Sequence, residues 1–80
     1  MEYCLIRNKK TGRYLLNSVA LGIEVPSNIF ENNFFREAIF TYSEVEEYIE
    51  RMEKSFIEFK LEDYEKVYLN ISLGVKINVL

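Results

Sequence analysis

Eighty residues are enough for one hydrophobic core and too few for two, so we expect a single domain over residues 1–80. Apolar residues make up 49% of the chain, and its twelve Phe and Tyr side chains can fill a core, which excludes a disordered chain. The formal net charge is −3, unlike the strongly basic balance of a typical nucleic-acid-binding domain.

The residues needed for most catalytic sites are missing. The sequence has no histidine, one cysteine and three scattered glycines, which excludes histidine triads, most zinc sites and a glycine-rich phosphate loop. Paired carboxylates are present, but they fall on a predicted exposed helix, where nothing raises the pKa of one carboxyl above that of the other, as general acid–base catalysis requires. We therefore expect no enzyme activity, no catalytic residue, no metal and no cofactor.

The only cysteine, Cys4, stands among apolar neighbours, and we expect a buried and unreactive thiol. The N-terminus lacks the basic stretch of a signal peptide, and charges interrupt every apolar run before membrane-spanning length. These features predict a cytoplasmic protein with no membrane segment, in a reducing compartment where unpaired cysteines persist.

The N-terminal segment has the pattern of a β-hairpin. Residues 2–7 and 13–16 are rich in aliphatic and aromatic residues, and a polar stretch from Asn8 to Gly12 separates them. Asn8 can open a turn by bonding its own backbone, and Gly12 can take the positive φ that closes such a loop.

Residues 19–25 alternate between apolar and other residues, which predicts a third short strand, and Pro26 ends it because proline cannot donate to a ladder. For residues 27–37, a short helix and a structured loop remain open. Phe34 and Phe35 in this segment can cover the core or offer exposed aromatic anchors to a partner. We expect them to cover the core and keep them as second candidates for partner contact.

The clearest element is an amphipathic helix at about residues 44–54, which follows a predicted strand at 38–42. Ser43 and Glu46 have the spacing of a capping box, in which each side chain bonds the backbone of the other residue. An apolar stripe recurs at helical spacing in Val45, Tyr48, Ile49, Met52 and Phe56. This stripe indicates that one helix face packs on the core.

A strand at 56–61 and a polar turn at Glu62 and Asp63 are expected next. Residues 67–79 then show the longest period-2 alternation in the chain, and the phase continues through Gly74. One strand bent at that glycine and two separate strands both remain open. Together the elements predict an α+β fold, a mostly antiparallel sheet (N-terminal hairpin, central strand and C-terminal strands) packed against one amphipathic helix.

Charge is unevenly distributed along the chain. Residues 1–13 hold four basic residues and one acid, a net +3, whereas residues 43–65 hold nine acids and three basic residues, a net −6. One flank of the predicted helix carries only the acids Glu46, Glu50 and Glu53, and Glu47 lies on the other flank. These glutamates either form a solvated face or an acidic ridge for a host protein with a basic surface.

Two other functions are compatible with the sequence. The basic turn containing Lys9 and Lys10 could contact phosphates, although the acidic balance of the domain argues against direct nucleic-acid binding. The alternating C-terminal segment could leave an open sheet edge that pairs with a second copy, so a homodimer with a structural or regulatory role remains open.

The chain resembles small acidic proteins carried by bacteriophages and mobile elements of low-GC bacteria. The resemblance lies in three stretches and their order: residues 3–15, residues 37–40 and the Glu-rich helix after Ser43. The amino-acid composition, rich in Lys, Glu, Asn, Ile and Tyr, is also similar to that of these proteins. Many proteins of this kind look like anti-defence inhibitors, anti-CRISPR proteins among them, whose acidic surfaces often mimic nucleic acid. The resemblance implies an inhibitor that binds a host nucleic-acid-handling protein, such as a CRISPR effector.

Overall fold

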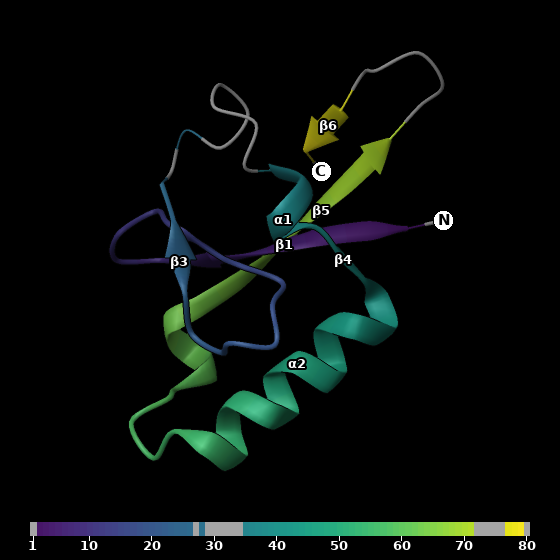
Figure 1. Ribbon diagram of the computed structural model, residues 1–80. Coiled ribbons are helices and arrows are strands. Elements are labelled where there is room, and N and C mark those ends of the chain that lie inside the picture. Colours follow the sequence, from purple (N-terminus) through teal and green to yellow (C-terminus); the bar gives the residue numbers. More distant parts are fainter. Residues whose placement is uncertain (1, 27, 29–34, 72–76, 80) are drawn as a thin grey trace.

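The structure, a computed structural model, describes residues 2–26, 28, 35–71 and 77–79 (Figure 1). Its helices and strands follow the order β1 (Tyr3–Asn8), β2 (Tyr14–Leu15), β3 (Glu24–Val25), α1 (Phe35–Ala38), β4 (Phe40–Thr41), α2 (Tyr42–Ser55), β5 (Tyr64–Ile71) and β6 (Ile77–Val79). A short 3₁₀ turn at Leu61–Asp63 precedes β5.

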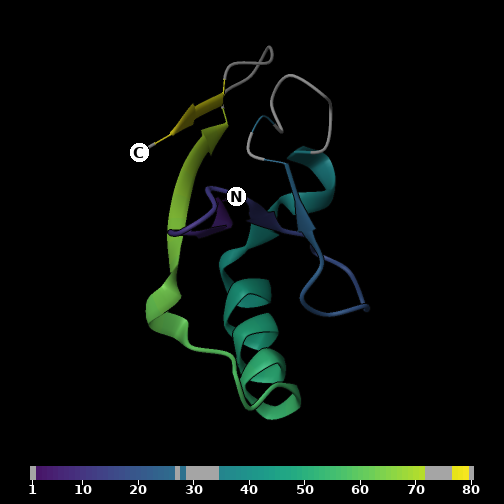
Figure 2. The same ribbon diagram turned by 90° about the vertical axis from the view of Figure 1, so that its left-hand side faces the viewer.

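Strand β1 lies inside an antiparallel sheet with the order β3-β2-β1-β5-β6. It pairs with β5 over its whole length along one edge. Its other edge is shared, because β2 pairs at Arg7 and β4 pairs at Tyr3 and Cys4. Helix α2 begins directly after β4 and therefore lies close to the β1–β5 pair, as Figure 2 shows.

Successive strand residues point to opposite sides of the sheet, and both sides carry buried apolar residues. Helix α2 covers one face, where the buried cluster consists of Cys4, Ile6, Leu15, Phe40, Val45, Tyr48, Ile49 and Met52. The opposite face holds a second buried cluster of Leu5, Tyr14, Val25, Ala38, Val67 and Leu69. The predicted α+β fold is thus confirmed, with an antiparallel sheet and one main helix.

The N-terminal hairpin is confirmed, with a turn built as expected. Gly12 has φ of +73° and its N–H donates to the carbonyl of Asn8 at 2.8 Å. The strands are shorter than predicted: only Tyr14–Leu15 and Glu24–Val25 pair, not 13–16 and 19–25. Gly22 has φ of +83°, so the chain turns where the sequence pattern continues a strand.

The segment between β3 and α2 differs from its prediction in detail. The described part of 27–37 ends in α1, a four-residue helix. The strand expected at 38–42 is limited to Phe40–Thr41, because Ala38 closes α1 and Tyr42 already begins α2. Most of 27–34, including Phe34, lies outside the described residues.

Helix α2 spans Tyr42–Ser55 rather than 44–54, and the predicted capping box at Ser43 and Glu46 is wrong. The cap is Thr41, whose Oγ1 accepts from the Glu44 N–H at 3.2 Å, while Glu44 Oε1 accepts from the Thr41 N–H at 2.8 Å. Thr41 keeps extended backbone angles because it still pairs with β1 on the sheet. The helix therefore begins at the next residue, Tyr42. Ser43 lies inside the first turn.

The chain after α2 corrects two further predictions. Phe56 does not belong to the buried stripe: it ends the helix in an extended conformation and is 43% exposed. The strand predicted at 56–61 is absent, and these residues form turns that lead into the 3₁₀ turn. Their apolar residues satisfy a strand pattern, but none of the strands that the structure describes is placed to pair with them.

The C-terminal alternation forms two antiparallel strands, β5 and β6. Their register pairs Asn70 with Asn78 and Ile71 with Ile77. In this register odd-numbered residues pair with odd-numbered ones and even with even, and paired residues point to the same face of the sheet. The alternation of apolar and polar residues therefore continues in the same phase from one strand to the other. The sequence could not distinguish this hairpin from one bent strand for that reason.

Candidate functional site

Helix α2 separates apolar and acidic side chains onto opposite faces. Val45, Tyr48, Ile49 and Met52 are buried against the sheet, as their spacing predicts. Glu46, Glu47, Glu50 and Glu53 are all exposed. The predicted contact residues on α2 are therefore accessible along one rigid element.

Glu46 is bridged to the sheet. The Nζ atom of Lys66 on β5 lies 2.7 Å from Glu46 Oε1, and this hydrogen bond raises the pKa of Lys66. Local sequence patterns do not indicate the pair, because the two residues are 20 positions apart and only the packing of α2 on the sheet brings them together. The negative charge of Glu46 is therefore largely balanced.

The other three glutamates differ in how far their charge is balanced. Glu50 forms an ion pair with Lys54 at 2.8 Å, one helical turn on, and this contact lowers the pKa of Glu50. Glu47 and Glu53 form no ion pair with any residue in the described part of the chain. The strongest outward negative charge thus lies at Glu47 and Glu53, with Glu50 between them.

Glu44 has a structural role in the same helix. Hydrogen bonds from Thr41 lower the pKa of its carboxyl, and Asn17 Nδ2 donates to its Oε2 at 3.4 Å. These contacts fix Glu44 at the start of α2, so we do not count it among the contact residues.

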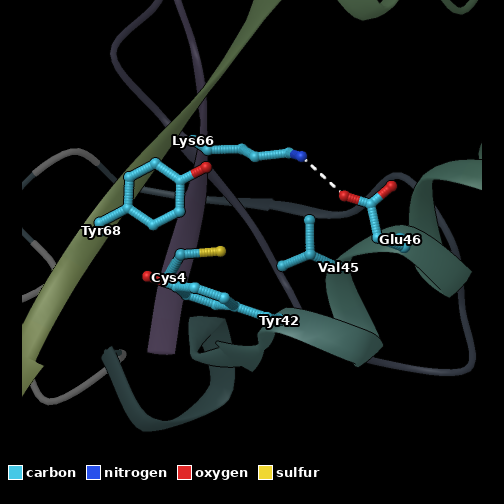
Figure 3. Close-up of a pocket in the computed structure, with 6 residues that line it drawn as sticks. All are labelled: Cys4, Tyr42, Val45, Glu46, Lys66 and Tyr68. Atoms are coloured by element: carbon cyan, nitrogen blue, oxygen red, sulfur yellow. Dashed lines mark hydrogen bonds and ion pairs between the residues drawn. The ribbon is translucent and has the colours of Figure 1, made fainter. Parts of the chain in front are cut away.

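A small groove separates the N-terminal half of α2 from β5 (Figure 3). The rings of Tyr42 and Tyr68 meet edge to face, with centroids 5.3 Å apart, and the Cys4 thiol and the Val45 side chain lie between helix and sheet. The groove measures about 130 Å³, well below the roughly 300–1,000 Å³ of small-molecule sites. It is suited to part of one side chain rather than to a cofactor.

The Cys4 thiol in this groove is only 1% exposed, and burial raises its pKa to about 11. A neutral thiol is a poor nucleophile, because the thiolate is the reactive form. Among the described residues, no group of three cysteine or carboxylate side chains is arranged to hold a metal ion.

The basic hairpin tip is partly neutralised by β5 and the turn before it. Arg7 forms an ion pair with Glu65, and Lys10 Nζ lies 4.0 Å from Asp63 Oδ1. The Lys9 N–H also donates to the carbonyl of Asp63 at 2.9 Å. The tip therefore offers less net positive charge to phosphates than its sequence indicates.

Of the aromatic candidates, Phe34 lies outside the described residues and Phe35 begins α1. Among the described residues, exposed aliphatic side chains occur at Val19 and Ile23 before β3, and a group of exposed apolar side chains follows α2 at Phe56, Ile57 and Leu61. The sequence pattern predicts a strand at 56–61 and places Phe56 on the apolar stripe of the helix, so it does not indicate an exposed apolar group there.

No protein-family model matches this chain, and neither curated protein sequences nor solved structures contain a significant match. None of the helices that the structure describes has the length and apolar character needed to cross a bilayer.

Proposed function

We propose that this protein is a small inhibitor, encoded by a phage or mobile element, that binds a nucleic-acid-handling protein in the cytoplasm of its host. The observation that carries the proposal is the solvent side of α2, opposite its buried stripe, where Glu47, Glu50 and Glu53 are exposed and where Glu47 and Glu53 form no ion pair with a described residue. We call these three residues the acidic face.

The acidic face has the rigidity that charge recognition requires. The opposite side of α2 is anchored by four buried side chains, and both its first turn and its link to β5 are fixed by side-chain hydrogen bonds. A helix rises about 1.5 Å per residue, so positions 47, 50 and 53 place carboxylates about 4.5 Å apart along the axis. This spacing is similar in scale to the ~3.4 Å between charges along one DNA strand.

Such a face suits a partner with a basic groove. Clustered single-sign charge accelerates association with an oppositely charged surface and rejects acidic surfaces. A protein that normally binds the phosphate backbone presents such a groove, and occupation of it would exclude nucleic acid. A CRISPR effector is one partner of this chemistry.

The test is competition for nucleic acid. A set of purified RNA-guided nucleases is assayed for target binding with and without the protein, and with the triple variant E47K/E50K/E53K. The matched control, E2K/E37K/E62K, makes the same change in net charge at three exposed positions outside the acidic face. We expect the wild type and the control to inhibit one or more nucleases and the triple variant to inhibit weakly. Equal inhibition by the triple variant would exclude the acidic face as the contact.

A homodimer is the second candidate, and the position of β6 favours it. Strand β6 ends the sheet order, whereas the opposite end is the two-residue β3, which Pro26 follows. An edge strand with unpaired backbone groups can pair with a second copy. Sedimentation equilibrium at high micromolar concentration distinguishes the two, because a monomer there excludes this candidate.

A further inference from the structure

An apolar hollow of about 270 Å³ opens at the C-terminal end of α2, away from the tyrosine groove near the start of the same helix. Three separate segments supply its apolar lining: Leu21, Gly22, Met52, Phe56, Phe59 and Tyr64. Figure 1 shows this end of α2 beside the connection that leads into β5. Its volume suits one or two side chains of a partner rather than a small-molecule ligand.

Hydrogen bonds fix the walls of the hollow. The Gly22 N–H donates to the Tyr48 hydroxyl at 2.9 Å, which holds the loop before β3 against α2. The Phe56 N–H donates to the Met52 carbonyl at 2.9 Å, and the Phe59 N–H donates to the Phe56 carbonyl at 3.2 Å. The hollow is therefore formed before any partner arrives, which lowers the ordering cost of binding.

Apolar side chains in the segment after α2 are exposed to solvent. Ile57 follows the lining residue Phe56 and its side chain is fully exposed, at 103% of the reference area. Leu61 is 46% exposed and Phe56 is 43% exposed. Grouped exposed apolar side chains next to a hollow are typical of protein-binding surfaces.

We propose that the hollow and Ile57 bind a basic amphipathic segment of a partner protein. A large apolar side chain of that segment enters the hollow, and its Lys or Arg side chains face Glu58, the only charged residue of the lining. Glu53 of the acidic face precedes Phe56 by three positions, so the two surfaces adjoin. The inference rests on the proposed function in one respect, namely that the ligand is a protein with basic charge.

A second copy of this chain fits the hollow less well than a basic partner does. The chain carries a formal net charge of −3, so two copies repel one another, and Glu58 would meet a surface of the same sign. Charge therefore favours a foreign, basic segment over a second copy.

Three synthetic helical peptides serve as probes: one amphipathic peptide of Leu and Lys, its Leu and Glu counterpart, and a Ser and Lys peptide of the same charge as the first. Binding to the full-length protein is followed by calorimetry and by the amide resonances of Gly22 and Phe59. We expect only the Leu and Lys peptide to bind and to shift both resonances. Binding of the Leu and Glu peptide with equal affinity, no binding of any probe, or shifts confined to residues outside the hollow would overturn the inference.

Variants separate this inference from the proposed function. Because Ile57 is fully exposed, Ile57→Ser leaves the fold intact. We expect this variant to bind the Leu and Lys peptide with an affinity lower by about tenfold or more. Val19→Ser, at an 85% exposed apolar residue outside the lining, is the control and should leave the affinity unchanged. Unchanged affinity in Ile57→Ser, with loss in E47K/E50K/E53K, refutes the hollow and supports the acidic face. Loss of affinity in Ile57→Ser, with none in E47K/E50K/E53K, supports the hollow, and the acidic face is then judged by nuclease inhibition alone.

Discussion

The ammonium group of Lys66 on β5 lies 2.7 Å from the Glu46 carboxylate on α2 and links the main helix to the sheet. This contact changes the expected distribution of negative charge on α2. Lys66 balances Glu46 and Lys54 balances Glu50, so the exposed glutamates of α2 that form no ion pair with a described residue are Glu47 and Glu53.

The Lys66–Glu46 link should contribute little to stability, although it orders the edge of the groove. The Glu46 side chain is 71% exposed, and exposed ion pairs contribute about 0–1 kcal/mol. We expect a double-mutant cycle of Glu46→Gln and Lys66→Met, measured by urea unfolding, to give a coupling free energy below about 1 kcal/mol. A coupling well above that value would show that the pair is shielded from water.

The start of α2 should depend on Thr41 and not on Ser43. Thr41→Ala removes the acceptor for the Glu44 N–H and should lower the free energy of unfolding by about 1 kcal/mol. Ser43→Ala is the matched control, since Ser43 lies within the first turn, and it should have a much smaller effect. Thermal unfolding of both variants measures the difference, and a larger loss in Ser43→Ala would contradict the observed cap.

The loop that forms one wall of the hollow should depend on the Tyr48 hydroxyl. Tyr48→Phe removes the acceptor of the Gly22 N–H and should reduce the free energy of unfolding by about 1 kcal/mol. Tyr68→Phe is the control, since its hydroxyl bonds no described residue in this structure, and it should have little effect. Hydrogen exchange at the Gly22 amide should accelerate only in Tyr48→Phe, and unchanged exchange would contradict this role.

Stability should fall at alkaline pH because of the buried Cys4 thiol. Burial raises its pKa from 9.0 to about 11, so between these values the unfolded chain loses a proton that the folded chain keeps. The contribution of Cys4 to the free energy of unfolding should therefore be constant below about pH 9 and fall as the pH rises toward 11. Burial also raises the pKa of Tyr48 and Tyr64, which extends the fall in the same direction.

The measurement is urea unfolding across this pH range, with Cys4→Ala as the comparison. The variant should be less stable at neutral pH because it leaves a cavity, yet its stability should fall less steeply between pH 9 and 11. Identical slopes in the two proteins would show that Cys4 ionises equally in the folded and unfolded chains.

The sequence was sufficient to predict the elements whose pattern is local. The buried stripe of α2, the turn at Gly12 and the alternation in β5 follow from spacing and backbone preference alone. The segment after α2 was predicted wrongly because apolar residues at alternating positions indicate a strand only where a neighbouring strand can pair with them. The cap at Thr41 was missed because its extended conformation depends on pairing with β1.

The acidic face and the hollow could be predicted only in part, because local patterns do not show which distant segments meet. The exposure of the helix glutamates follows from helical periodicity. Their unequal charge balance does not, because Lys66 reaches Glu46 only through the packing of α2 on the sheet. The apolar hollow joins segments near positions 22, 56 and 64, so no local pattern in the sequence indicates it.

The most direct test of the acidic face is the salt dependence of association with a nuclease for which the competition assay detects inhibition. Association rates are measured by stopped flow between about 50 and 200 mM salt, for the wild type, for E47K/E50K/E53K and for the control E2K/E37K/E62K. The account predicts that the rate falls steeply with salt for the wild type and the control, and that it is slow and nearly independent of salt for the triple variant. Equal rates and equal salt slopes for the wild type and the triple variant would contradict it.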